Sequence, residues 1–159
     1  HKCRNVEIIG IDIEEEMIKE AIKTNASKNI TYLNEDIITF KLEPTNLITS
    51  YYTIQFISPS VRQLLFNKIY KALNWGGALI IFEKVRASDA RFQDYITQIY
   101  QEFKLKNNFT PEQILSKSKS LKKILEPFSS QGNLDLMKRA GFKDIITIQK
   151  YLCFEIKAV

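Results

Sequence analysis

The sequence has few glycines, and none of them forms the loop that many nucleotide-binding domains use. The 159 residues contain five glycines and no Gly-x-Gly-x-x-Gly spacing: Gly10, Gly76, Gly77, Gly132 and Gly141. That loop normally joins the first strand of a doubly wound sheet to its first helix, where glycine lets the backbone approach the ligand. The chain also begins with His1 rather than methionine. We therefore expect a fragment that lacks the first strand and its glycine loop.

Cysteine, histidine and long apolar runs are also scarce. The two cysteines, Cys3 and Cys153, cannot form a disulfide framework, which suits a reducing cytosol and predicts a cytoplasmic protein. A single histidine makes a Cys/His zinc site implausible, and we predict no metal. No apolar run approaches the roughly 20 residues of a membrane span, and no signal peptide is visible. We expect no membrane association.

What is present is typical of one globular domain. Hydrophobic residues make up 45% of the chain and charged residues 26%, and a length of 159 residues predicts a single domain over 1–159. The net charge of +5 is compatible with an anionic substrate or with RNA. A solvated lysine-rich surface explains the same charge, so direct RNA contact stays open.

Two acidic residues follow two neighbouring predicted strands. The apolar run 6–12 predicts a strand buried on both faces that ends at Asp12, and residues 29–33 predict a second strand followed by Asp36. The carboxyl ends of parallel strands share one edge of the sheet, which is where open α/β sheets bind ligands. An acid there can accept hydrogen bonds from ribose hydroxyls. A solvated acid at a strand end or a helix cap remains the alternative for Asp12, and a turn acid for Asp36.

The rest of the chain continues the strand–helix alternation. We predict a strand and exit loop over 47–56, a helix from Ser58-Pro59 that ends at Asn74-Trp75-Gly76-Gly77, and a buried strand over 78–82. A helical insertion with a basic face spans about 88–126, with a capping box at Thr110. A helix over 134–140 precedes an antiparallel hairpin of strands 144–149 and 152–156. The fold class is α/β, a doubly wound and mostly parallel sheet with a terminal antiparallel hairpin.

This pattern resembles the class I S-adenosylmethionine (SAM)-dependent methyltransferase fold, a Rossmann-like arrangement. Several runs are similar to one narrower family, the carboxy-S-adenosyl-L-methionine synthases of tRNA wobble-uridine modification. These runs are Ile9-Gly10-Ile11-Asp12, Asp36-Ile37, Thr53-Ile54-Gln55-Phe56, the segment 68–79, Glu83-Lys84, Phe103-Lys104 and Ala140-Gly141-Phe142. The resemblance implies SAM or its carboxylated form as cofactor, prephenate as the source of the carboxyl group, and a homodimer.

The resemblance also implies roles for individual residues. Asp12 would hold the ribose hydroxyls and Ile13 would pack on the adenosine, while Asp36 and Ile37 would flank the adenine. Tyr51 occupies a cofactor-binding position at which the family has asparagine, although packing at the sheet edge explains it as well. Ser118 stands where the family has an arginine that grips the extra carboxylate, so we expect its neighbours to substitute for it, namely Lys117 and Lys119.

The sequence leaves three functions open. The first is a carboxy-SAM synthase, and the second is an ordinary SAM-dependent methyltransferase with an unidentified acceptor. The third is a catalytically silent module that binds RNA through its basic helices. No sequence feature identifies a catalytic base or nucleophile.

Overall fold

The computed structural model describes residues 6–159, and the chain divides into two compact units, His1–Leu42 and Glu43–Val159. The expectations that concern His1 and Cys3 lie outside the described residues. Within residues 6–159, no helix is both long enough and apolar enough to cross a membrane.

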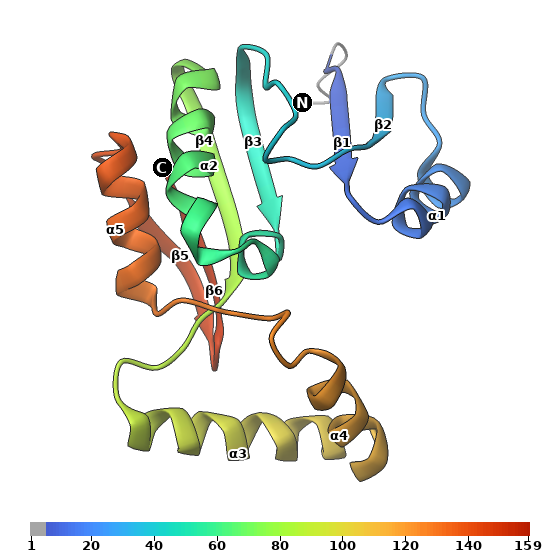
Figure 1. Cartoon of the computed structure of the whole chain (residues 1–159), viewed down its shortest axis with the longest axis vertical. Coiled ribbons are helices and arrows are strands. Elements are labelled where there is room, and N and C mark those ends of the chain that lie inside the picture. Colours follow the sequence, from blue (N-terminus) through green and yellow to red (C-terminus); the bar gives the residue numbers. More distant parts are fainter. Residues whose placement is uncertain (1–5) are drawn as a thin grey trace. The chain divides into compact units, whose positions relative to one another are not determined.

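The first unit is a strand–helix–strand motif (Figure 1). Strand β1 (Ile8–Asp12) pairs in parallel with β2 (Ile30–Asn34), in a register that runs from Ile8 opposite Ile30 to Asp12 opposite Asn34. Helix α1 (Glu15–Asn25) connects them and carries acidic residues in its first turn, where the helix dipole favours negative charge. The predicted parallel pair of strands is therefore confirmed.

The predicted burial of the first strand is wrong. Ile8 and Ile9 are 48% and 57% exposed, although the sequence indicated a strand covered on both faces. The physical reason is that β1 has a single hydrogen-bonded neighbour, β2, and that one helix cannot cover both faces of a strand pair. Ile18 on α1 is the buried apolar residue among the described part of this unit.

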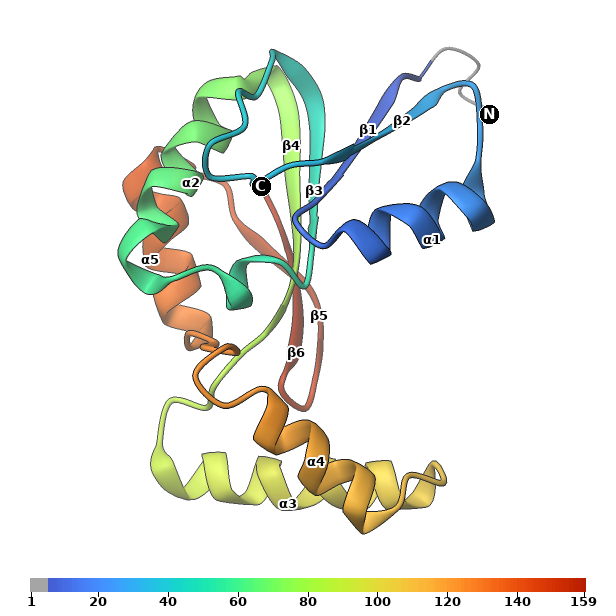
Figure 2. The same cartoon turned by 45° about the vertical axis from the view of Figure 1, so that its right-hand side comes forward.

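The second unit is built around a four-stranded sheet with the order β3-β4-β6-β5. Strands β3 (Thr45–Tyr51) and β4 (Leu73–Lys84) are parallel, and β6 (Phe154–Ala158) is antiparallel to both β4 and β5 (Ile146–Tyr151). The predicted terminal hairpin is thereby confirmed. Helices α2 (Pro59–Ala72) and α5 (Ser130–Ala140) lie side by side in Figures 1 and 2. The core between helices and sheet includes Leu65, Phe66, Ile69, Leu79, Ile81, Leu136 and Met137.

The junction between α2 and β4 differs from the prediction. Asn74-Trp75-Gly76-Gly77 does not cap the helix, because α2 ends at Ala72 and Leu73 is already extended. Thr45 pairs with Leu73 whereas Leu47 pairs with Ala78, so this run is an irregularity in the strand. Gly76 has a φ of +77°, so its left-handed conformation serves this irregularity rather than a helix end.

The helical insertion consists of α3 (Ala90–Lys106) and α4 (Pro111–Ser120). The predicted capping box is confirmed, because the Thr110 hydroxyl accepts from the Gln113 amide while the Gln113 side chain accepts from the Thr110 amide. Figures 1 and 2 place both helices beyond the carboxyl ends of β3 and β4, near the turn between β5 and β6. A short 3₁₀ turn, η1 (Ile54–Phe56), lies between β3 and α2.

Candidate functional site

The first candidate site is the acidic rim, defined here as Asp12, Ile13, Asp36 and Ile37 in the first unit. Asp12 ends β1 directly opposite Asn34, which ends β2, and Asp36 follows in the same loop as Asn34. The parallel register therefore brings both carboxylates to the same edge of the strand pair, as the sequence predicted.

Short-range hydrogen bonds set the orientation of Asp12. Its Oδ1 accepts from the Glu14 amide at 2.9 Å. The Asn34 side chain donates to the backbone oxygens of Asp12 (3.1 Å) and Ile13 (2.9 Å), which fixes the loop after β1 against β2. Among the described residues, no hydrogen bond reaches Oδ2 of Asp12, and the Ile13 side chain beside it is 64% exposed. The role of Asn34 was not predicted from the sequence, although the sequence places this residue at the end of the second predicted strand.

Asp36 is arranged in a similar way. Its Oδ1 accepts from the Ile38 amide at 2.8 Å, and its backbone oxygen accepts from the Phe40 amide at 2.8 Å. These bonds form a local turn that leaves Oδ2 of Asp36 without a hydrogen bond from the described residues. Ile37, which follows Asp36 in this turn, is half-buried. The rim thus offers two carboxylate acceptors flanked by apolar side chains.

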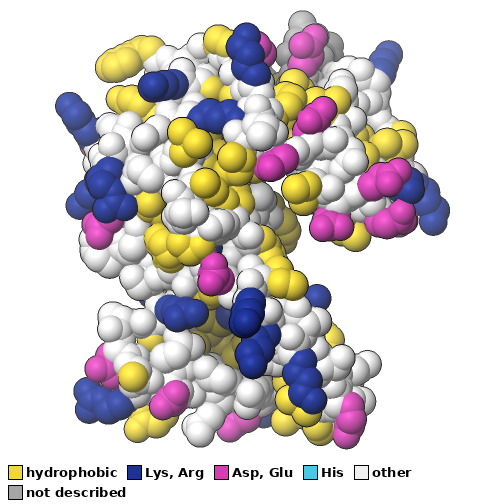
Figure 3. Space-filling model, in the orientation of Figure 1, with side chains coloured by type: hydrophobic (Ala, Val, Ile, Leu, Met, Phe, Trp, Pro, Cys, Tyr) yellow, Lys and Arg dark blue, Asp and Glu magenta, His cyan; other side chains and the backbone are white. Residues whose placement is uncertain are grey.

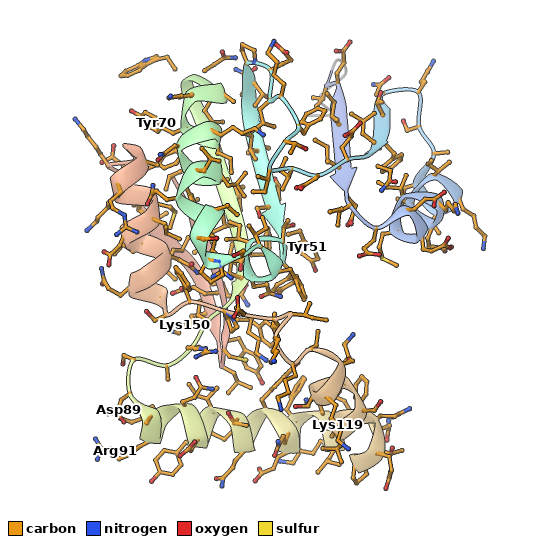
Figure 4. The ribbon with its side chains drawn as sticks, viewed as in Figure 1. Tyr51, Tyr70, Asp89, Arg91, Lys119 and Lys150 are labelled. Carbon is orange, nitrogen blue, oxygen red and sulfur yellow. The ribbon has the colours of Figure 1, made fainter. Side chains whose placement is uncertain are left out.

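In the second unit, Tyr51 ends β3 and Tyr52 follows it directly. Tyr51 is 66% exposed, and its ring packs against those of Tyr52 (4.7 Å between centroids) and Phe82 (5.0 Å). Figure 4 shows Tyr51 at the carboxyl end of β3. Tyr52 has a φ of 54°, and its amide donates to the Phe82 oxygen at 2.8 Å, so the chain turns sharply here. Tyr51 both packs on its neighbours and presents an exposed ring.

The second candidate site is a cavity of about 320 Å³ that we call the aromatic cavity. Three ring contacts tie its walls together: Tyr52 to Phe154 (5.8 Å), Tyr100 to Phe154 (5.4 Å) and Phe103 to Tyr151 (6.1 Å). Its walls come from the end of β3, from α3 and from the β5–β6 hairpin. The lining residues are Tyr52, Tyr100, Phe103, Gln149, Tyr151, Leu152, Phe154 and Ile156.

Two lysines stand beside this cavity. The ammonium groups of Lys84 and Lys104 lie 5.2 and 4.4 Å from the centre of the Tyr100 ring, in cation–π geometry. Among the described residues, no carboxylate lies within ion-pair distance of either group. Burial, and then the charge of Lys84, lower the pKa of Lys104, while burial raises the pKa of Tyr100. Figure 3 shows Lys and Arg side chains around a hollow with a hydrophobic floor in the second unit.

The sequence did not predict this cavity. Tyr100 and Lys104 are four positions apart on a predicted helix, and Glu83-Lys84 follows a predicted strand. Each of these local features could be predicted, but the sequence did not indicate that they meet. The lysines predicted to bind a carboxylate, Lys117 and Lys119, are exposed on α4 and are not among the cavity's lining residues. Figure 4 shows Lys119 on this helix.

Within 6–159, no group of three or more His, Cys, Asp or Glu side chains is placed to hold a metal ion. Cys153 is a free, buried thiol, and burial raises its pKa. Its neighbours on β6, Glu155 and Lys157, form a buried ion pair at 3.2 Å, in which the lysine also donates to the Thr147 hydroxyl.

Sequence comparisons relate the chain to one group of enzymes. A family model described as a methyltransferase domain matches residues 1–77. The carboxy-S-adenosyl-L-methionine synthase of Staphylococcus epidermidis is 38% identical over 148 residues, which are 93% of this chain and 65% of the relative. The enzymes of that name from Nautilia profundicola and Campylobacter jejuni are 31% and 33% identical, over 94% and 96% of this chain. The chain spans about 65% of the length of these curated relatives.

Comparison with solved structures identifies the fold. Human N-acetylserotonin methyltransferase in complex with SAM superposes with a TM-score of 0.64 at 16% identity, over 96% of this chain and 39% of that protein. An O-methyltransferase-like protein of Nostoc punctiforme superposes with a TM-score of 0.62 at 14% identity, over 97% of this chain and 44% of that protein. The predicted fold class, that of the class I methyltransferases, is confirmed.

Proposed function

We propose that this chain, a homologue of the carboxy-S-adenosyl-L-methionine synthases with the class I methyltransferase fold, binds SAM and takes part in its carboxylation. The observation that carries the proposal is an identity of 31–38% to enzymes of that name over at least 93% of the chain. The acidic rim supports the binding of SAM, and the aromatic cavity supports the binding of the carboxyl donor.

The acidic rim is suited to the adenosine of SAM. A ribose presents two neighbouring hydroxyl donors, and Oδ2 of Asp12 is an exposed acceptor whose orientation is set by the Glu14 and Asn34 bonds. The adenine amino group is a donor that Asp36 can accept, and the exposed Ile13 and half-buried Ile37 offer apolar contact to the ring faces. We also assign Tyr51 to cofactor binding, as an exposed ring at the end of β3. SAM would supply the sulfonium-bound methyl group to which the carboxyl group is added.

The aromatic cavity is suited to the carboxyl donor. A prephenate-like donor is a small ring that carries carboxylates, and a cavity of about 320 Å³ with aromatic walls has room for such a ring. Lys84 and Lys104 supply positive charge next to those walls without a carboxylate partner among the described residues. Burying an unpaired carboxylate is strongly unfavourable, so a cation beside the ring site is what an anionic donor requires.

We further propose that Lys117 and Lys119 bind the carboxylate of the carboxylated cofactor across a homodimer. Both are exposed on α4 and flank Ser118, which replaces the family's gripping arginine. A lysine provides a point charge rather than a bidentate fork, so the grip would be weaker than that of arginine. The product would serve tRNA wobble-uridine modification in the cytoplasm.

The direct test is to incubate the protein with SAM and prephenate and to analyse the cofactor by mass spectrometry. We expect carboxylated SAM to form with prephenate and not without it. The variant Lys117→Ala/Lys119→Ala should lose its preference for carboxylated over plain SAM in competition binding. Lys122→Ala/Lys123→Ala, which removes two neighbouring lysines, is the matched control and should keep that preference. Methyl transfer to an acceptor without any carboxylated product would identify an ordinary methyltransferase instead.

A further inference from the structure

Arg62 on α2 is fully buried and does not pair with a carboxylate at ion-pair distance among the described residues. Its guanidinium instead donates to three backbone oxygens, those of Ile57 (2.8 Å), Glu126 (2.7 Å) and Gln55 (3.4 Å). It also lies 4.4 Å from the centre of the Phe128 ring. One side chain therefore joins the η1 segment to the segment that leaves the helical insertion.

Gln55 and Glu83 complete the connection on the other side. The buried Gln55 side chain accepts from the Lys84 amide at 2.8 Å, and the buried Glu83 carboxylate accepts from the Ile54 amide at 3.1 Å. These bonds join η1 to the end of β4, where the helical insertion begins. The pattern could not be read from the sequence, since buried charged residues are rare. A signal was present, because Arg62 interrupts the apolar stripe of α2.

The two ends of the insertion are also fastened to each other. Arg86 and Ser129 form a parallel bridge, and the Arg86 amide donates to the Phe128 oxygen at 2.9 Å. The Glu126 amide donates to the Gln55 oxygen at 2.9 Å. Residues 86–129, which include α3 and α4, thus have a closed base. Arg62 and Gln55 both bond to this base at Glu126, whose oxygen accepts from Arg62 and whose amide donates to Gln55.

We infer that Arg62 is a positioning residue that holds the helical insertion, and with it the α3 wall of the aromatic cavity, in place. This inference rests on the proposed function only where it assigns the cavity to the carboxyl donor. Tyr100, Phe103 and Lys104 belong to α3, so their distance from Tyr52 and Phe154 depends on how the insertion is anchored. Arg62 is not among the residues that line the cavity, so it acts through the segments it joins.

Arginine is suited to this role for a physical reason. Its planar fork donates in several fixed directions and so reaches carbonyl oxygens of two separate segments, which a lysine ammonium cannot reproduce. Burial is costly for the cation and lowers the pKa of Arg62, while the charges of Glu83 and Glu126 raise it. Three carbonyl acceptors and the Phe128 ring compensate for the lost solvation.

The test compares Arg62→Lys with Arg139→Lys, an exposed arginine of the same unit that donates to the Gln63 side chain. Hydrogen–deuterium exchange is measured for both variants, together with titration of SAM and of 3-phenylpropionate, a small ring carboxylate. In Arg62→Lys we expect exchange to rise in residues 86–129 while β4 and α5 keep their protection. We expect α3 to hold its binding-competent position in roughly a tenth of the Arg62→Lys molecules, so affinity for 3-phenylpropionate should fall roughly tenfold, and affinity for SAM should not change. Arg139→Lys should leave the exchange and the affinities for both ligands unchanged.

Two results would overturn the inference. One is unchanged protection of residues 86–129 in Arg62→Lys. The other is a rise in exchange spread evenly through the second unit, which would make Arg62 a residue of general stability. If exchange rises locally but even the wild type does not bind 3-phenylpropionate, Arg62 still positions the insertion, and it is the assignment of the cavity that fails.

Discussion

The acidic rim and the aromatic cavity are held in place by different kinds of contact. In the rim, Asp12 and Asp36 are each oriented by an amide two positions further along the chain. In the cavity, Tyr52, Tyr100 and Phe154 meet although they are far apart in the sequence. The rim therefore depends on local turns, and the cavity depends on the packing of a whole sheet and an inserted pair of helices.

The same contrast holds for the strands beneath the two sites. In β4, Leu79 and Ile81 are at most 1% exposed, because β4 lies between β3 and β6 and is covered by helices. In β1, an equally apolar sequence leaves Ile8 and Ile9 about half exposed. Burial therefore follows from the number of neighbours a strand has, and an apolar sequence alone does not determine it.

The largest effect should come from truncating a buried strand. We expect Leu79→Ala to lower the free energy of unfolding by about 2–5 kcal/mol, since it removes transfer energy and leaves a cavity. Ile9→Ala in the exposed β1 should cost less than about 1.5 kcal/mol. Urea unfolding followed by circular dichroism measures both. Equal losses would show that β1 is as well packed as β4 in solution.

The next largest effect concerns the acidic rim. We expect Asp12→Ala to weaken SAM binding on the order of tenfold to a hundredfold, because hydrogen bonds to a charged acceptor contribute about 1.5–3 kcal/mol. Asp36→Ala should lower the affinity for SAM by less than Asp12→Ala does, since the proposed partner of Asp36 is one amino group. Isothermal titration with SAM measures both, and Glu15→Ala on the exposed first turn of α1 is the control. Unchanged affinity in a folded Asp12→Ala protein would move the cofactor to another site.

A smaller effect should appear in the pH dependence of stability. Burial raises the pKa of Glu83 from 4.5 to about 8, outweighing the Ile54 and Gln55 amides and the Arg62 charge, which lower it. Folding then favours the protonated form, so the stabilisation is fully present below pH 4.5 and is lost as the pH rises through about 8. The slope cannot exceed about 1.4 kcal/mol per pH unit for one group. Between pH 5 and 8.5, the free energy of unfolding measured in urea should therefore change less with pH in Glu83→Gln than in Glu102→Gln, which alters an exposed residue and is the control. The same pH dependence in both variants would contradict the raised pKa of Glu83.

Local features of the molecule could be predicted from the sequence. The parallel strand pair with its two acids, the capping box at Thr110 and the terminal hairpin all depend on neighbouring residues, and all were found. The resemblance to carboxy-SAM synthases was likewise confirmed by homologues. What could not be predicted depends on distant segments: the walls of the aromatic cavity, the exposure of β1, and the bonds of Arg62 to Glu126 and Gln55.

The central claim is that the acidic rim binds the cofactor and the aromatic cavity binds a ring carboxylate. The most direct test titrates SAM and 3-phenylpropionate into Asp12→Ala and Lys104→Met, with Lys106→Met on the same helix as control. Methionine keeps the length of the lysine stem and removes its charge. Asp12→Ala should lower the affinity for SAM alone. Lys104→Met should lower the affinity for 3-phenylpropionate alone, by a few-fold to about tenfold for a lost cation. Lys106→Met should change neither affinity. A Lys104→Met protein that binds 3-phenylpropionate as tightly as the wild type does would contradict the account.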